Sequence, residues 1–397
     1  MASARLSSVR ASVSRITHGL GVPTVGVAEL TRALGLDKKL AWQISNLLSE
    51  RDPLRSARFI PGPQPLKRFC EAARARGVAP EVITQAQSDI RDFQRFVTRH
   101  LGDEETFEEI VACHRGSGDD SVSVRMRKQL FQANSSLLRG RAHAIVRTAV
   151  FTLDEAGTGI SFAIVRGLVG LLRYSDGRPW RLSSVRATEG PNPRLGMHLN
   201  PLPGIARQDG EVPIWKEFSR GVGLDGYRTE TPDGYIEDWV PASPVGLSGK
   251  MDCVTAECGE LPNWRYRSPT EPYHSITSPV QTPCEWIVMD QFIDERIWGE
   301  VKPESILLTD VRQGPERPWH ARPEDRLDFA PEVESLGRGI DAVHCVQVPM
   351  VSELTRAMFH QLGVEAERYM HFRLMLQYPP VPSRVGMAHE LPEAPGC

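Results

Sequence analysis

Long apolar runs are missing from this 397-residue sequence, and none of its apolar stretches approaches the ~18 residues that cross a membrane. The opening residues, MASARLSSVRASVSRITHGLG, also lack the continuous apolar segment of a secretory signal. We therefore expect a cytoplasmic protein that makes no membrane contact. Cysteine is scarce as well: the seven residues are odd in number and scattered, which argues against a disulfide framework and favours reduced thiols.

The signatures of common enzymes are equally scarce. The sequence contains no G-x-S-x-G nucleophile elbow, no phosphate-binding P-loop and no G-x-G-x-x-G after an expected strand. Cys253 and Cys258 form only one loose pair, with His274 and Cys284 downstream, whereas structural zinc sites favour paired knuckles. We therefore predict no catalytic residue, no metal site and no cofactor.

What the sequence does have is an uneven distribution of charge. Residues 1–80 carry 13 Lys and Arg against 5 Asp and Glu, a balance of +8. The rest of the chain carries 34 against 45, a balance of −11. A basic segment before an acidic body is typical of a nucleic-acid-binding module whose remainder is kept off the phosphates, although chance clustering would give the same numbers.

The periodicity of apolar residues changes once along the chain. Up to about residue 138 they recur at helical spacing, beginning with Leu6, Val9 and Val13. From residue 141 the runs RAHAIVRTAVFTL and ISFAIVRGLVGLLRY, and later CEWIVMDQF, SILLTDV and YMHFRLMLQY, are typical of strands, with PMVSELTRAMFHQLG as a late helix. We expect the final dozen residues to be frayed. The predicted fold class is α+β, with an α-helical N-terminal region and a β-rich C-terminal region.

A length of 397 residues favours two or three domains. We predict a DNA-binding region over 1–80, a helical linker or dimerisation region over 81–138, and a β-rich ligand-sensing or self-association domain over 139–397. The first of these carries the strongest local signal in the chain.

That signal is the segment TVGVAELTRALGLDKKLAWQISNLL, residues 24–48. Two helices that meet across a tight turn need a permissive residue at the turn and apolar residues where they touch. Gly35 supplies the turn, Leu36 fills the angle between the helices, and Asp37 can cap the second helix. The residues expected to face inward are Val27, Leu30, Leu34, Leu40, Ala41, Ile44 and Leu48.

Residues 24–48 resemble the helix-turn-helix of bacterial regulators such as the IclR, MarR and LacI families. One departure is Thr31, where those families usually carry Ala at the contact between the helices. No wing is expected, because the residues after Arg51 read as loop and further helix. The resemblance implies that the second helix enters the major groove of DNA.

On this reading, two groups of residues meet the DNA. Outward residues of the second helix can bond to base edges or phosphates, and nearby arginines flank the groove on phosphates. The first group is Lys38, Lys39, Trp42, Gln43 and Asn46, and the second is Arg32, Arg51, Arg55 and Arg58. An exposed Trp42 would also suit a protein partner, and a purely structural helical pair is the alternative to DNA binding.

The predicted function is a sequence-specific DNA-binding transcriptional regulator. Its predicted partners are double-stranded DNA, a second copy of the chain in a homodimer, and a small-molecule effector. One alternative is a metal-dependent nuclease tethered to DNA, with Asp290 and Glu300 holding Mg²⁺ and Lys302 steadying the attacking water. Another is a structural or scaffold protein in which the helical pair serves packing alone.

Overall fold

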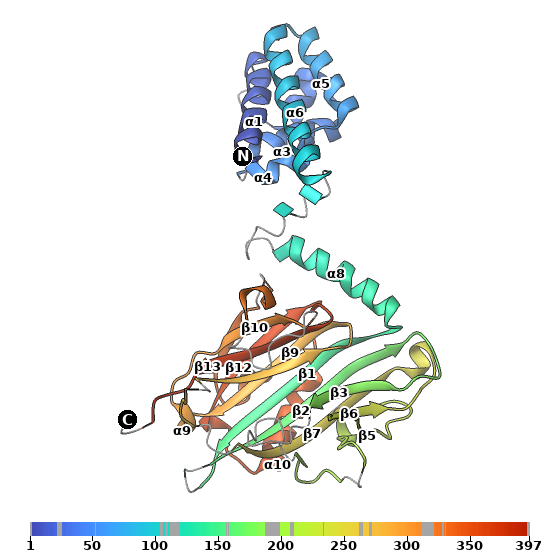
Figure 1. Ribbon diagram of the computed structural model, residues 1–397, viewed down its shortest axis with the longest axis vertical. Coiled ribbons are helices and arrows are strands. Elements are labelled where there is room, and N and C mark those ends of the chain that lie inside the picture. The colour runs from blue at the N-terminus through green and yellow to red at the C-terminus, as the bar shows by residue number, and fades with distance from the viewer. Residues whose placement is uncertain are drawn as a thin grey trace. The chain divides into compact units, whose positions relative to one another are not determined.

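The chain folds into two compact units, residues 1–118 (unit 1) and 119–397 (unit 2). A computed structural model describes residues 2–21, 26–51, 53–103, 106–107, 110–111, 120–155, 157, 159–186, 199–206, 210–232, 234–261, 265–269, 272–310, 321–327, 329 and 331–394. Helices precede a strand-rich region, so the α+β fold class predicted from the sequence is confirmed (Figure 1). No helix among these residues is both long enough and apolar enough to span a membrane.

Unit 1 is helical. Its elements are α1 (Ala2–Gly19), α2 (Val27–Leu34), α3 (Lys38–Ser49), α4 (Pro53–Ser56), the 3-10 turn η1 (Ala57–Phe59), α5 (Pro63–Ala75) and α6 (Pro80–Leu101). The apolar spacing of α1 has the expected effect, because Leu6, Val9 and Val13 are fully buried. Ile83 and Ile90 of α6 join the same core. None of the described residues of this unit lies in a strand, in agreement with the expected absence of a wing.

Unit 2 begins with α8 (Asp120–Leu137), in which Arg127 donates to the carbonyl of Gln377 and Asn134 to the carbonyl of Val381. The segment 81–138, expected as one linker or dimerisation region, is therefore divided between the two units. The strands are β1 (Gly140–Leu153), β2 (Ile160–Arg173), β3 (Trp180–Arg186), β4 (Asn200–Pro201), β5 (Tyr227–Glu230), β6 (Tyr235–Val240), β7 (Met251–Leu261), β8 (Tyr273–Val280), β9 (Cys284–Asp294), β10 (Glu304–Thr309), β11 (Val333–Arg338), β12 (Tyr369–Gln377) and β13 (Ser383–Glu390). The remaining elements are α9 (Glu295–Trp298), α10 (Met350–Leu362), η2 (Lys216–Phe218), η3 (Gly246–Gly249), η5 (Pro323–Asp325), η6 (Asp341–Val343) and η7 (Ala366–Arg368).

These strands form one large sheet and two small ones. The large sheet has the order β11-β12-β9-β1-β2-β7-β4, and the small sheets have the orders β10-β13-β8 and β3-β6-β5. β1 and β2, two of the strands that the sequence predicts, pair as a long antiparallel hairpin, and β1 pairs in parallel with β9 on its other side. The expected strands at β9, β10 and β12 and the expected helix α10 are confirmed.

The end of the chain differs from expectation. The final dozen residues were predicted to be frayed, but β13 continues to Glu390 and lies between β8 and β10. The prediction was wrong for residues 386–390, because the partners of this strand are remote in sequence. Val385 and Met387 belong to the apolar core of unit 2, which no pattern in the nearby sequence predicts.

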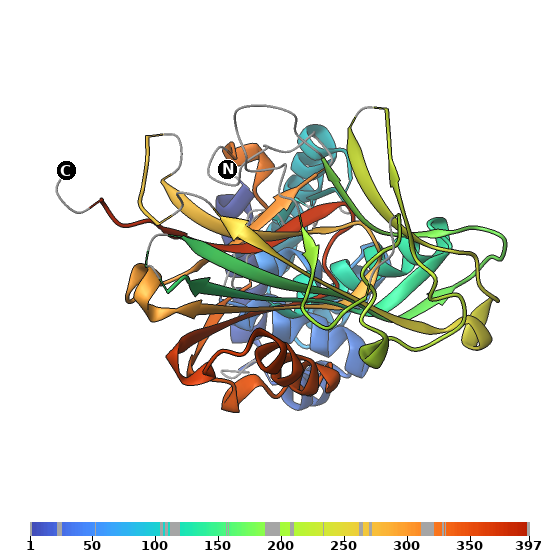
Figure 2. The same ribbon diagram turned by 90° about the horizontal axis from the view of Figure 1, so that it is seen from below.

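The two faces of the large sheet are covered differently. Apolar residues of one face, such as Val146 and Val150, pack against Leu354 and Met358 of α10, which lies along the sheet in Figure 2. Residues of the other face share a core with the small sheets, including Ile276 of β8. A stretch of charged residues interrupts this second face between the parts covered by the two small sheets.

Candidate nucleic-acid interface

The turn between α2 and α3 has the backbone that the sequence predicts. Gly35 ends α2 in the left-handed region, at φ 65° and ψ 28°, and donates its N–H to the carbonyl of Thr31 at 2.9 Å. Asp37 precedes α3 with extended backbone, and its Oδ1 accepts from the N–H of Leu40 at 2.9 Å. Three residues therefore suffice to end one helix and begin the next.

The helices touch through a compact apolar cluster, which contains Leu30, Leu34, Leu36, Leu40, Ala41, Ile44 and Leu47 as buried residues. Leu48 and Val27, which the sequence predicts to face inward, are partly buried and pack against this cluster, whereas the fully buried Leu47 was not predicted. Leu47 lies three residues after Ile44 and continues its helical face, whereas the carbonyl of Leu48 accepts from Arg10 at 2.9 Å. Arg10 thus ties the end of α3 to α1.

Thr31 is the residue that departs from the usual Ala at this contact. Its Oγ1 is buried and has no hydrogen-bond partner among the described residues. A buried hydroxyl without a partner is unfavourable, so Thr31 fits by size but leaves a local defect.

The predicted base-reading residues lie on the outer face of α3. Lys38 and Lys39 are exposed in its first turn, and Trp42 is 50% exposed one turn later. Gln43 and Asn46 are partly exposed. The Nδ2 of Asn46 donates to the carbonyl of Trp42 at 2.8 Å, so this amide is engaged within its own helix.

Trp42 belongs to a small aromatic cluster that reasoning from the sequence missed. Its ring meets the ring of Phe59 edge to face, with centroids 5.3 Å apart. The guanidinium carbon of Arg58 lies 4.7 Å from the centroid of the same Phe59 ring. The cluster places one of the predicted phosphate-binding arginines beside the exposed end of α3.

Two of the other predicted arginines, Arg32 and Arg51, are exposed. Arg32 lies in the last turn of α2, and Arg51 follows α3. The side chain of Arg55 lies outside the described residues. Two cations near the turn were not predicted: Arg68 forms an ion pair with Asp37 at 3.0 Å, and Arg76 lies against Gly35.

The electrostatics of α3 favour an anion at its beginning. The first turn of the helix contains no acidic residue, and the positive end of the helix dipole points there. The hydrogen bond from Leu40, helped by Arg68, lowers the pKa of the Asp37 carboxyl, so the cap stays ionised at neutral pH. Lys38 and Lys39 oppose the dipole, which is unfavourable for helix stability and concentrates positive charge at an exposed end.

The three residues of the nuclease alternative differ in burial: Asp290 is buried, whereas Glu300 and Lys302 are exposed. Asp290 is buried in β9 and bound by Arg373 through both carboxylate oxygens, at 2.7 and 2.9 Å, with His371 also at 2.7 Å. Glu300 and Lys302 are exposed beyond the end of β9. The carboxylate of Asp290 therefore holds β12 against β9, and the geometry does not favour a catalytic trio.

The loose cysteine set does not form a metal centre either. No group of three or more His, Cys, Asp and Glu side chains that could hold a metal occurs among the described residues. Cys253 and Cys284 lie in the core of unit 2, while Cys258 points to the opposite face of β7 and donates to the carbonyl of Pro201. Burial raises the pKa of the Cys253 thiol to about 12, so this thiol is inert at neutral pH.

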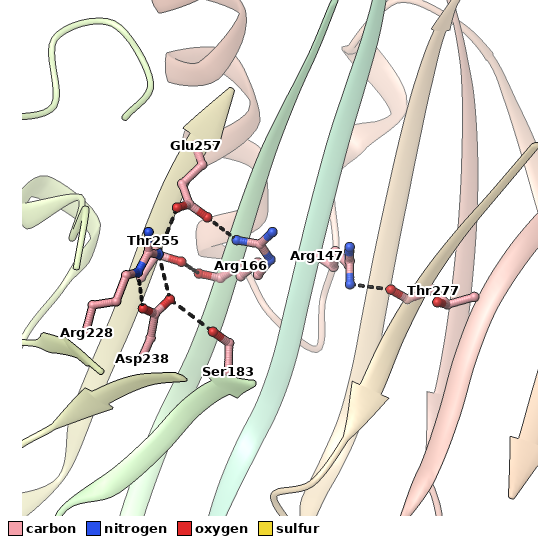
Figure 3. A network of polar contacts seen from close by, with 8 residues as sticks. All are labelled: Arg147, Arg166, Ser183, Arg228, Asp238, Thr255, Glu257 and Thr277. Atoms are coloured by element: carbon pink, nitrogen blue, oxygen red, sulfur yellow. Dashed lines mark hydrogen bonds and ion pairs between the residues drawn. The ribbon is translucent and has the colours of Figure 1, made fainter. Parts of the chain in front are cut away.

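Unit 2 contains a network of charged residues that no motif indicated (Figure 3). Arg228 of β5 binds both oxygens of Asp238 of β6, at 2.7 and 3.0 Å, and reaches Glu257 of β7 at 3.0 Å. Ser183 of β3 donates to Asp238 at 3.0 Å, and Arg166 of β2 binds the second oxygen of Glu257. The network joins the β3-β6-β5 sheet to the large sheet.

Glu257 is the centre of this network and is 1% exposed. Burial raises the pKa of its carboxyl, but the guanidinium groups of Arg166 and Arg228 outweigh that effect, and the net pKa is lowered. Glu257 is therefore ionised and fully committed to two arginines.

Comparison with known proteins adds no relative. No protein-family model matches the chain, and no curated protein is similar to it in sequence. The function is therefore inferred from the geometry and charge of the residues described above.

Proposed function

We propose that the chain is a sequence-specific DNA-binding regulator that places α3 in the major groove. The observation that carries the proposal is the pair Lys38 and Lys39, both exposed in the first turn of a helix held at a glycine turn. Neither lysine forms an ion pair with the described residues, so both are available to phosphates or base edges.

The surroundings of α3 support this assignment over simple packing. A helical pair that served packing alone would gain stability from acidic residues in the first turn of α3, but beyond the Asp37 cap this turn has no acidic residue and two lysines. Arg32, Arg51 and Arg58 add exposed cations around it. Such a surface attracts DNA of any base sequence, and contacts to base edges add the specificity.

Gln43 is the best candidate for a base contact. Its side chain is partly exposed, uncharged and without a hydrogen bond to the described residues. Gln can bond through two atoms to adenine, which is worth about 1–3 kcal/mol of discrimination. Asn46 can do the same only after its amide leaves the carbonyl of Trp42.

The remaining parts of the proposal follow from DNA recognition. A single module of this size binds weakly, so we propose a homodimer that reads paired half-sites. We also propose that unit 2 senses a small-molecule effector and that the protein acts in the cytoplasm.

The first experiment measures binding of the full chain to a random-sequence duplex by fluorescence anisotropy over a series of salt concentrations. Replacing Lys38 and Lys39 by Gln should weaken binding and reduce the slope of log affinity against log salt by about 1.8, or roughly 0.9 for each lost phosphate contact. The matched control replaces Arg91 and Arg95, two exposed cations on α6, and should leave the slope near that of the unmodified chain.

Two results would contradict the proposal. One is an absence of salt-dependent binding by the unmodified chain, which would leave the scaffold alternative. The other is an equal reduction of the salt dependence in the Lys38/Lys39 and the Arg91/Arg95 double variants. That result would indicate attraction of DNA to the net charge of the protein and not a contact made by α3.

A further inference from the structure

Two arginines lie directly opposite each other on the large sheet. Arg147 of β1 pairs in register with Arg166 of β2, so both side chains project from the same face with Cβ atoms about 4.5–5.5 Å apart. Their neighbours two residues away on that face, such as Ile145 and Ile164, belong to the apolar core. Like charges in this position are destabilising.

The two side chains lean apart, as Figure 3 shows. Arg166 turns toward Glu257 and binds its carboxylate, whereas Arg147 turns the other way and donates through Nη1 to the carbonyl of Thr277. Thr277 belongs to β8, an edge strand of the β10-β13-β8 sheet. Arg147 is thereby anchored to β8 of one small sheet, whereas Arg166 is anchored to Glu257 of β7, which in turn binds Arg228 of the other small sheet.

Arg147 lacks a counter-charge. No carboxylate of the described residues lies within ion-pair distance of it, and its Nε is buried without a hydrogen-bond partner among them. Burial, together with repulsion from Arg166 and Arg384, lowers the pKa of Arg147 to about 9. Of the five N–H donors of the Arg147 guanidinium group, one has a partner among the described residues, the carbonyl of Thr277.

The charges nearby do not compensate. In the network, the carboxylates of Asp238 and Glu257 neutralise the guanidinium groups of Arg228 and Arg166. No carboxylate of the network is left to neutralise Arg147. Arg384, the other cation that affects Arg147, already has Asp310 at 3.8 Å. The site therefore has one positive charge in excess and unused donors on two guanidinium groups.

We propose that Arg147 and Arg166 together bind the anionic group, a carboxylate or a phosphate, of a small ligand. Guanidinium groups match the geometry of both oxyanions and can bind them through two hydrogen bonds each. An anion between the two would relieve their repulsion and use the Nε of Arg147. The site lies within unit 2 and does not depend on DNA binding; as part of the proposed regulator, its ligand is the effector.

The test uses the full chain without DNA, with inorganic phosphate and succinate as probes in separate titrations by isothermal calorimetry. The buffer is kept at constant ionic strength with sodium chloride. We expect one saturable site per chain for at least one probe and a loss of affinity of tenfold or more in Arg147→Met. The control is Arg181→Met, which removes an arginine paired with Glu237 on the β3-β6-β5 sheet and should bind as the unmodified chain does.

A second measurement separates a binding role from a structural one. In buffer free of multivalent anions, Arg147→Met should melt at the same temperature as the unmodified chain or higher, because the variant removes a like-charge repulsion. A lower melting temperature together with unchanged anion affinity would overturn the proposal. Arg147 would then have only a structural role, as a contact between β1 and β8. Failure of both probes to bind the unmodified chain would also overturn it, whatever the outcome of the DNA experiments.

Discussion

Replacement of Gly35 tests the turn on which the interface depends. This glycine has φ 65°, a region that residues with a side chain adopt at a cost. A Cβ added there would lie 3.2 Å from Nη2 of Arg76, the mobile end of a long side chain that can move away. The penalty for a substitution should therefore come from the backbone angle and not from crowding.

The magnitude follows from two opposing effects. Left-handed backbone costs a residue with a Cβ about 1–2 kcal/mol, and the loss of glycine freedom in the unfolded chain returns roughly 0.4–1 kcal/mol. Gly35→Ala should thus destabilise unit 1 by about 1 kcal/mol. Gly35→Val should cost more, because a β-branched side chain fits this region least well, and Gly35→Asn should cost less, because Asn adopts it readily.

The assay is urea unfolding of the full chain followed by circular dichroism at 222 nm, where the helices contribute most. The expected order of stability is Gly, Asn, Ala, Val, with unit 2 unfolding as before and DNA binding lost in Gly35→Val. Asn is larger than Ala, so crowding would place Asn below Ala. That reversed order would refute the backbone argument, and equal stability of all four would show that the turn is not constrained at residue 35.

Three further predictions concern single side chains. Thr31→Ala should stabilise unit 1 by about 1 kcal/mol in urea unfolding, because it removes a buried hydroxyl without a partner; destabilisation would show that the hydroxyl is satisfied. Gln43→Ala should spare binding to random DNA and cost about 1–3 kcal/mol on the site selected from a random pool; an unchanged selected motif would remove Gln43 from base reading. Burial lowers the pKa of His389 from 6.5 to about 4, so the unfolded chain binds this proton first, and unit 2 should lose about 2–3 kcal/mol of stability between pH 7.5 and 4.5. His389→Leu should lose correspondingly less over the same range, and an identical pH dependence would assign the acid sensitivity to other groups.

The helical region was the most predictable part of the fold, because its signals are local. Gly35 and Asp37 act on residues three or four positions away, and their roles can be read from the chain itself. The choice between Leu47 and Leu48 could not be made in this way. Both lie near the end of α3, and the contact of Arg10 with the Leu48 carbonyl comes from a helix 38 residues earlier.

The strands were recognisable, but their arrangement was not. β1 and β2 are adjacent in sequence and pair as a hairpin, which short-range turn signals predict. The parallel pairing of β1 with β9 joins Ala142 to Cys284, and no local pattern specifies a partner so remote. The same reason explains why β13 was not predicted. Its strand conformation depends on pairing with β8 and β10, which are remote in sequence, more than on its own residues.

The charged network was beyond prediction for a related reason. Arg166, Arg228 and Glu257 come from three strands, and alternation along each strand indicates only that one side chain faces the core. A charged residue at such a position reads as an exception to the pattern. Only the register of the sheet shows that Arg166 and Glu257 come together on neighbouring strands.

The two clusters of cations also show why net charge cannot decide what a region binds. Residues 1–80 have a balance of +8, and their key lysines are exposed, where long-range attraction to a polyanion operates and salt screens it. The later part of the chain has a balance of −11, which by itself argues against binding anions. Arg147 is nevertheless partly buried beside a second arginine, and in that environment one uncompensated charge acts over short distances and is weakly screened. The part of the chain after residue 80 can therefore repel DNA as a whole and still bind a small anion at one point, so salt should weaken DNA binding steeply and anion binding only slightly.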